Sequence, residues 1–540
     1  MHLSNRTTPA ATAGLGAHAR RRAFLAACAA CVLTGCGTYV PDHAWQRVSC
    51  KTPRQCTDEE YAGAVKSTPV FVRRDGWWTY RQALPADTDP ARYIERRVPK
   101  AYLEFNAEGW PHDVNQWNAV ERYLKNTHKP LFVLVYVHGW HQNASTVASD
   151  ESENAVKFDD LLARTKDSLV RKFPDGRVPD VLGIYVGWQG EVYDGGYRWF
   201  RSVGSRAGVA NAIAANRSPD GVRGTLDAVA KAMRETHPES RMVVMGHSFG
   251  GRLLSRAFVP DFIEGRSQPL GERVLVNTVN AAIGADYFSP LYAKGFARAE
   301  ALRPSWINMT SKEDWATGWI YPKAFSLGWL KPEWSEKEKE MEKDREVVRE
   351  EEKASGTTIG HFPAYITHVL DVMRCSGSDC RKVEDHVDAN AWEQDAGKGF
   401  EYNQFVQRYA WLPPVSDVPV DYCGVLVRRP MLSMQQREEL RSKAVCNVAD
   451  VNFDYLQSKG SRDGFPPSER RVPAQGRMWN IETSESMLNF RVPSLGGVSV
   501  HNGYVSTAWT RMLVDLIYEP DYLQIWPPAP SAGVVTGQKN

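Results

Sequence analysis

The chain has 540 residues, of which 42% are hydrophobic and 24% are charged, so it can bury a sizeable core and does not have the composition of a disordered protein. Lysine and arginine (66) nearly balance aspartate and glutamate (64), and no basic stripe interleaved with aromatic residues occurs, which argues against a nucleic-acid partner. At roughly 100–200 residues per domain, the length fits several domains or one large domain with insertions.

The first 36 residues have the order of an export signal. Three arginines at 20–22 precede an apolar run at 23–33, which is too short to span a bilayer because a spanning helix needs about 20 residues. The Leu-Thr-Gly-Cys sequence at 33–36 resembles the lipobox of bacterial lipoproteins, and the arginines resemble, more loosely, a twin-arginine signal. The resemblance implies that residues 1–35 are a lipoprotein signal peptide and that Cys36 is acylated and holds the mature protein at a membrane.

Removal of residues 1–35 leaves 62 basic against 64 acidic residues, so acyl chains rather than charge would anchor the protein. The residue after the cysteine is Gly37 and not aspartate, which in lipoproteins of Gram-negative bacteria implies release to the outer membrane. We therefore expect a lipid-anchored protein of the bacterial cell envelope, facing the periplasm or lying in the outer membrane.

Six cysteines remain in the mature chain, an even number that predicts up to three disulfides in an oxidising compartment. Sequence proximity favours Cys50–Cys56, Cys375–Cys380 and Cys423–Cys446, and the other pairings stay open. Paired histidines do not accompany these cysteines, which argues against a zinc site.

The next part of the chain has the pattern of an α/β core. We assign residues 36–65 to a tether and residues 66–316 to the first part of the core. Continuous apolar runs, which are typical of strands buried on both faces of a parallel sheet, occur at 131–137, 181–186, 242–245, 274–279 and 306–309. Amphipathic helices are expected near 116–124, 158–169, 226–233 and 249–258. This alternation predicts a doubly wound, mostly parallel sheet.

Residues 246–250, Gly-His-Ser-Phe-Gly, match the pattern G-x-S-x-G. The string alone is weak because short glycine motifs arise by chance. The context makes the match more specific, because a predicted strand precedes residues 246–250 and a predicted helix follows them, as a nucleophile elbow requires. In such a turn the hydroxyl of Ser248 stands at the carboxyl end of a central strand, beside a helix N-terminus.

With this motif the chain resembles the α/β-hydrolase family, and within it the bacterial lipase- and esterase-like members. The resemblance is good for residues 131–316 and loose for residues 479–518. His138, Gly139 and Trp140 follow the first buried run and resemble the family's oxyanion loop. The resemblance implies that the backbone amides of Trp140 and Phe249 bind the oxyanion. It also implies structural roles for His138 and His247.

The family's chain order places the acid and then the histidine after the serine. Asp314, in a turn that resembles the family's S-x-x-D-x-A sequence, is the favoured acid; Asp286 and Glu313 are alternatives. His501 precedes the last predicted helix and is the favoured base, because imidazole titrates near neutral pH and has one nitrogen for the serine and one for the acid. His361 and His368 are rivals that lack the strand–loop–helix context.

The stretch between the acid and the histidine is far longer than the strand and helix that a minimal family member needs. Residues 317–475 are therefore expected to form a large disulfide-containing cap over the catalytic face. Residues 476–525 would return to the core with its last strand, the histidine loop and the final helix, and residues 526–540 would be a disordered tail.

Together these residues predict an exported, membrane-anchored serine hydrolase that cleaves carboxylic esters, with lipid esters among the candidate substrates. Ser248 would be the nucleophile, His501 the base and Asp314 its partner, and no metal or organic cofactor would be needed. The competing interpretation is a non-catalytic envelope lipoprotein that uses this fold and its cap as a binding module.

Overall fold

The computed structural model describes residues 38–333 and 354–382 with gaps, the largest of which are 74–78, 146–153 and 294–303. Beyond these it describes only 406–411, 421–422, 425–426, 456–457, 478–483 and parts of 488–518. The predicted signal peptide, Cys36, the Cys423–Cys446 pair and the predicted tail lie outside the described residues.

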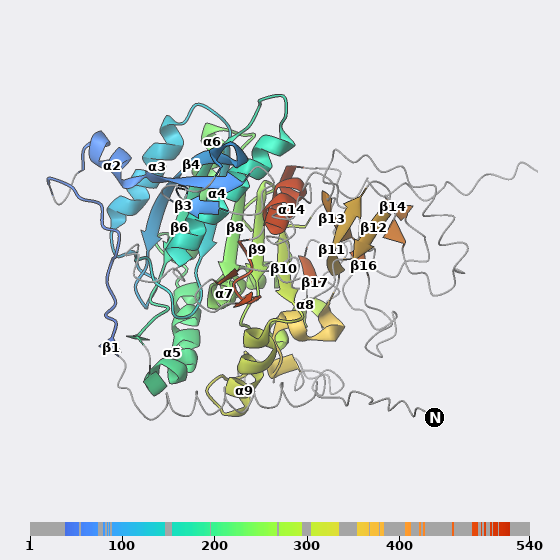
Figure 1. The fold of residues 1–540 in the computed structure, drawn as a ribbon. Helices are drawn as coiled ribbons and strands as arrows, with labels where there is room; N and C mark the ends of the chain where they lie inside the picture. The colour runs from blue at the N-terminus through green and yellow to red at the C-terminus, as the bar shows by residue number, and fades with distance from the viewer. Residues whose placement is uncertain are drawn as a thin grey trace, which may run out of the picture.

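One large sheet organises the chain, and its central strands run in parallel (Figure 1). In spatial order these are β11 (His368–Ser376), β17 (Met478–Thr483), β10 (Trp306–Ser311), β9 (Val274–Val279), β8 (Arg241–His247), β5 (Leu131–Val137), β6 (Asp180–Gly187) and β4 (Tyr93–Glu104). The predicted mostly parallel α/β sheet is confirmed.

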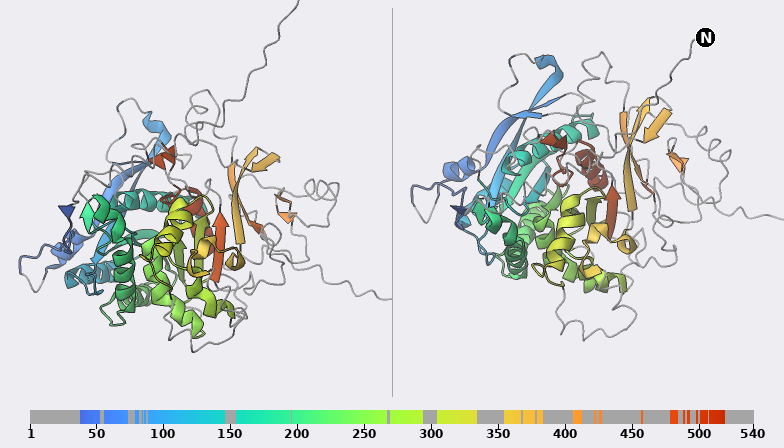
Figure 2. Two further views of the ribbon diagram at one scale, coloured as in Figure 1. Left: turned by 90° about the horizontal axis from the view of Figure 1, so that it is seen from below. Right: turned by 60° about the horizontal axis from the view of Figure 1, so that its bottom comes forward.

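Antiparallel strands extend the sheet at both ends. Beyond β4 lie β2 (Lys66–Arg73) and β3 (Thr79–Arg81), and beside β11 lie β12 (Asp379–Lys382), β13 (Val406–Trp411) and β16 (Leu456–Gln457). Both views of Figure 2 show these two extensions at opposite sides of the molecule.

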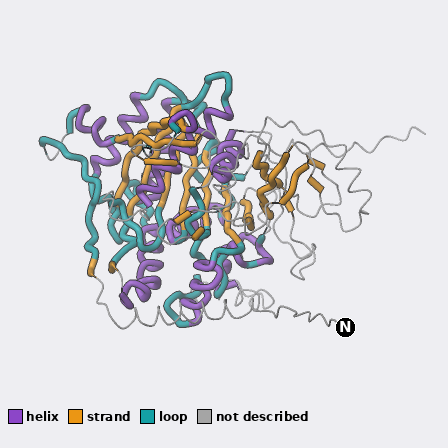
Figure 3. The backbone as a smooth tube through the Cα atoms, viewed as in Figure 1, coloured by secondary structure: helices purple, strands orange, loops and turns teal. Residues whose placement is uncertain are grey.

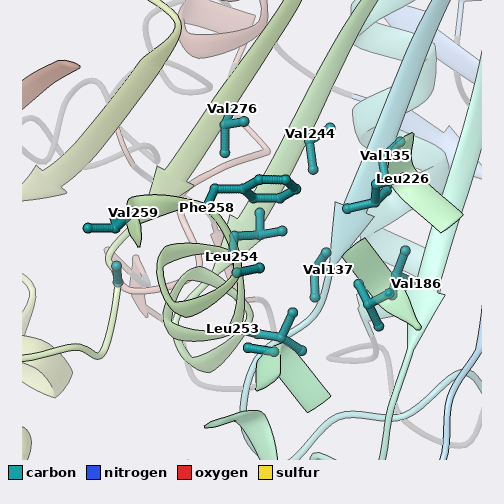
Figure 4. Packing of buried hydrophobic residues seen from close by; sticks show 14 of the residues in the cluster. Val135, Val137, Val186, Leu226, Val244, Leu253, Leu254, Phe258, Val259 and Val276 are labelled. Atoms are coloured by element: carbon teal, nitrogen blue, oxygen red, sulfur yellow. The ribbon is translucent and has the colours of Figure 1, made fainter. Parts of the chain in front are cut away.

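Helices cover both faces of the sheet. On one face α3 (Val114–Asn126), α5 (Gly196–Ala215), α6 (Val222–Thr236) and α7 (Phe249–Ile263) pack on Val133, Val135 and Val137 of β5. On the other face α4 (Asn154–Lys172) and α14 (Thr507–Tyr518) pack on Phe132, Leu134 and Tyr136. Because successive side chains of a strand point to opposite faces, the unbroken apolar run 131–137 is what two buried faces require. Figure 4 shows Leu254 and Phe258 of α7 against the valines of the strands.

The N-terminal segment, residues 38–48, packs on the core and differs in this from the predicted tether. β1 (Thr38–Tyr39) pairs antiparallel with β7 (Tyr193–Asp194). The amides of Trp45 and Gln46 each donate to the buried carboxylate of Glu104 at 2.7 Å. A disulfide, Cys50–Cys56, then leads to α2 (Asp58–Ala64) and confirms that predicted pairing.

Part of the predicted cap belongs to the core instead. β11 extends the sheet in parallel with β17, and Ile359 is fully buried. The side-chain amide of Asn480 on β17 donates to the carbonyls of Ile359 and Tyr365, both at 2.9 Å. Residues 383–405 and most of 412–477 are outside the described part of the chain, as are the side chains of the predicted Cys375–Cys380 pair. The backbone register does place those two cysteines opposite each other on β11 and β12.

Among the described residues, no helix combines the length and the apolar character that a bilayer crossing requires.

Candidate active site

Ser248 occupies a strained turn between β8, which ends at His247, and α7, which begins at Phe249. Its backbone has φ 54° and ψ −117°, a conformation that residues other than glycine rarely adopt. The turn is held from two sides, because the Ser248 amide donates to Val279 at 3.0 Å and its carbonyl accepts from Ala282 at 3.1 Å. This is the strand–turn–helix geometry that the G-x-S-x-G motif predicts.

The glycines around Ser248 are required by close packing of the backbone. A Cβ on Gly250 would collide with the carbonyl of Val137, at the end of β5. A Cβ on Gly139 would lie 2.9 Å from Cβ of Ser248 and 3.1 Å from the carbonyl oxygen of His247. The loop that follows β5 therefore lies directly against the serine turn, where an oxyanion loop would have to be.

The structure brings Asp314 and His501 together. Nδ1 of His501 lies 3.0 and 2.9 Å from the two carboxylate oxygens of Asp314. Asp314 is almost fully buried just after β10, and it also accepts from the amide of Ala316 at 3.0 Å and from the hydroxyl of Thr317. Burial alone would raise the pKa of Asp314, but the charge of His501 and the hydrogen bonds from His501 and Thr317 hold it below its usual value.

The loop that carries His501 is fixed to residues beside the serine. The carbonyl of His501 accepts from the side-chain amide of Asn280 at 2.9 Å and lies 2.8 Å from Nε2 of His247. The imidazole rings of His247 and His501 have their centroids 4.7 Å apart. The loop of His501 therefore lies against the residue that precedes Ser248. Among the contacts of the described residues, none joins the hydroxyl of Ser248 to the imidazole of His501, whereas the contact of His501 with Asp314 is formed.

His247 and His138 have the environments of structural histidines. Burial lowers the pKa of His247 well below its usual value, and its Nε2 points at the carbonyl of His501. His138 accepts at Nε2 from the amide of Trp188 (3.0 Å) and donates at Nδ1 to the carbonyl of Gly139 (2.9 Å), and burial lowers its pKa to about 4. Its ring stacks on Trp188 with an interplanar angle of 6°. His138 thus holds the loop that contacts the serine turn.

Each of the two predicted oxyanion donors follows a residue of the serine turn or of the loop packed on it. Phe249 is the first residue of α7, where amides have no partner within the helix and carry the positive end of its dipole. Trp140 follows Gly139, and its indole donates to Ser202 at 2.9 Å while its ring lies 6.2 Å from that of Phe249. The indole contact fixes this loop to α5.

The alternative acids lie elsewhere. Asp286 accepts from the amide of Glu333 (2.9 Å) and the hydroxyl of Ser355 (3.0 Å), and burial together with the charge of Glu333 raises its pKa to about 6. Glu313 accepts from Ser311 at 2.8 Å. Of the rival histidines, His368 begins β11 in the sheet.

His361 lies near the acid but not against it. Its Nε2 is 3.1 Å from Oγ1 of Thr317, whose hydroxyl donates to Asp314. Thr317 and Asn280 support the site and are not among the residues predicted from the sequence. Thr317 could have been noticed as a hydroxyl three residues after the acid, whereas no sequence signal connects Asn280 with residue 501.

Within the described ranges, side chains with the spacing of metal ligands gather at Cys50, Cys56 and Glu60, but there both cysteines are joined in the disulfide. Comparisons of the chain with protein-family models, with curated proteins and with solved structures find no match, so its function rests on the geometry of the site.

Proposed function

We propose that the protein is a serine hydrolase of the α/β-hydrolase type that cleaves carboxylic esters and is anchored through Cys36 in the bacterial cell envelope. The observation that carries the proposal is the contact of His501 with the buried Asp314, on a loop bonded to the neighbours of a strained serine. A histidine with a purely structural role needs neither a buried carboxylate partner nor a place on a loop bonded to the residue before Ser248.

The proposed mechanism uses groups of the chain alone. Asp314 holds Nδ1 of His501, so Nε2 is the nitrogen left to take the proton of Ser248. The serine oxygen bonds to the ester carbonyl carbon, and the amides of Phe249 and Trp140 stabilise the negative oxygen that forms. Collapse of this intermediate expels the alcohol, which takes the proton from His501. Water, activated by His501, then releases the acid and restores the serine.

The test is covalent labelling of the full mature chain with a fluorophosphonate probe. We expect labelling at Ser248 that the Ser248→Ala substitution abolishes and the control Ser326→Ala, at an exposed serine on α9 (Tyr321–Ser326), leaves unchanged. Absence of labelling in folded protein would overturn the proposal and favour the binding-module interpretation. A panel of nitrophenyl esters of rising acyl length would then define the preferred substrate.

A further inference from the structure

Among the described residues, the large exposed apolar side chains are concentrated at one edge of the sheet. In the described part of the chain the large ones are Tyr39, Trp110, Val114, Val170, Trp315, Trp319 and Leu327. Single exposed apolar residues are normal when they are scattered. Here all but Val170 lie in segments at the carboxyl edge of the parallel sheet, the edge that also carries Ser248.

The clearest group follows β10. Trp315 and Trp319 are 56% and 55% exposed, whereas Asp314, directly before Trp315, and Thr317, between the two tryptophans, are almost fully buried. The segment η3 (Ala316–Ile320) and its N-cap Trp315 therefore bury Thr317, which donates to Asp314, and expose the two indoles. Leu327, at the end of α9, is 59% exposed.

The remaining exposed residues reach the same edge from other strands. Trp110 and Val114 lie between the end of β4 and the first turn of α3. Tyr39 lies on β1, which pairs with β7 just after the end of β6. Val170, the exception, is near the end of α4, which leads to the opposite, amino edge of β6.

Helix α5 links the N-terminal segment to the residues that follow β10. It begins directly after β7, the partner of β1. Eight residues into this helix, Gly204 packs so closely on the backbone of Trp329 that a Cβ would collide with its carbonyl. In Figure 1, β1, α5 and α9 follow one another from left to right along the lower side of the molecule.

The predicted lipid anchor is close in the sequence to β1, which lies at this side. Cys36 precedes Thr38 by two residues, which at most span about 7 Å. Because β1 is paired with β7, acyl chains on Cys36 would enter the membrane close to the carboxyl edge. Tryptophan and tyrosine favour the headgroup level of a bilayer, where an apolar ring and a polar N–H or O–H are both accommodated.

We propose that Tyr39, Trp315, Trp319 and Leu327 form a membrane-contacting surface, and that the enzyme takes its ester substrate from that lipid surface. The inference rests on the proposed function for the anchor and the hydrolysis. Exposed Lys323 and Lys331, in and after α9, add positive charge that suits an anionic leaflet.

The contact can be tested without catalysis. The acylated mature Ser248→Ala protein is placed in vesicles of phosphatidylethanolamine and phosphatidylglycerol, with and without brominated acyl chains, and tryptophan fluorescence is measured. We expect bromine quenching that falls when Trp315→Ser and Trp319→Ser are added, and that stays unchanged with the control Val170→Ser. Equal quenching with and without these two tryptophans would overturn the surface, whatever the outcome for hydrolysis.

The substrate source is tested by rates. In otherwise wild-type protein, Trp315→Ser with Trp319→Ser should lower hydrolysis of a long-chain ester embedded in vesicles at least about tenfold, because two half-exposed indoles bury substantial apolar area. Hydrolysis of a soluble short-chain ester should stay unchanged. An equal fall on both substrates would show an effect on the catalytic centre and would contradict a membrane role.

Discussion

Asp314 and Asp286 are two buried carboxylates whose partners give them opposite properties. Asp314 faces His501 and the hydroxyl of Thr317, and although burial opposes its ionisation, these partners lower its pKa. Asp286 faces the carboxylate of Glu333, so burial and like charge both raise its pKa. Only the first environment favours a carboxylate that stays ionised while a neighbouring imidazole gains a proton.

The two acids should therefore respond differently to the same substitution. We expect Asp314→Asn to lower kcat by about 10³–10⁴-fold with little change in KM, because the amide no longer holds the productive tautomer of His501. Asp286→Asn should leave kcat near the wild-type value. Steady-state ester hydrolysis by the purified proteins measures both, and an equal loss in the two variants would contradict the assignment of Asp314.

Asp286 should also make stability depend on pH. Its pKa in the folded chain, about 6, lies above the ordinary 3.8, so folding takes up a proton between these values and the stabilisation is complete below 3.8 and lost as the pH rises through 6. Asp286→Asn removes the cost of ionisation and should raise the free energy of unfolding at pH 8 by up to about 3 kcal/mol.

Urea unfolding at pH 8 and at pH 4 measures this gain, which should shrink at the lower pH. Asp314→Asn is the matched control. Because the folded pKa of Asp314 is lowered, its ionised form stabilises the fold above the ordinary 3.8, so its loss should reduce stability at pH 8. A gain for Asp286→Asn that is independent of pH would contradict the buried-carboxylate explanation.

At the scale of elements, the sequence was informative where one physical pattern dominates. The run 131–137 predicted a strand because both faces are buried, and the position of Ser248 followed from a strand and a helix that flank it. Helix α5 was not predicted, since glycines and arginines interrupt its apolar face. β11 was assigned to a cap because its place beside β17 depends on a pairing across about a hundred residues, which no local pattern records.

The site shows the same division. The expected order of serine, acid and histidine along the chain led to Asp314 and His501, which the structure brings into contact at 2.9 Å, and the role of Ser248 stays a prediction. Residues 38–48 are bound to the core through Glu104, and the loop of His501 is bound through Asn280. Each of these contacts joins segments that are distant in the sequence. Such contacts are decided by tertiary packing and leave no periodic signal in the sequence.

Helix α5 offers an element-scale prediction with an internal control. Gly204→Ala would place a Cβ on the carbonyl of Trp329 and should lower stability by about 1–3 kcal/mol, the usual cost of overpacking. Gly208→Ala, one helical turn later in open space, should raise it by about 0.5–1 kcal/mol because alanine favours a helix. The urea midpoints of the two variants, compared with that of the wild type, measure these changes in stability. Stabilisation by both substitutions would show that α5 is not packed against Trp329.

At the scale of the whole molecule, Glu104 connects the N-terminal segment to the sheet. Its carboxylate accepts from the amides of Trp45 and Gln46 and from the side chain of Gln116. Hydrogen bonds to a charged acceptor contribute about 1.5–3 kcal/mol each. Glu104→Ala should therefore release residues 38–48, with at least about tenfold faster amide exchange there than in the wild type.

Hydrogen–deuterium exchange with mass spectrometry measures this release. Glu108→Ala, at an exposed acid a few residues along the chain, is the control and should leave exchange unchanged. Faster exchange throughout β5 and β8 in the Glu104→Ala protein would indicate general unfolding and not release of one segment.

The hydrogen bonds of Asn280 and His247 to the backbone carbonyl of His501 have an evolutionary consequence. These two residues hold the backbone carbonyl of His501, and Asp314 orients its ring. Asp314 and His501 are 187 residues apart, and changes in length or composition between them that keep β11 and β17 in the sheet need not move the proposed reaction centre. Selection could replace the rest of that stretch to suit a new substrate while inheriting the chemistry intact.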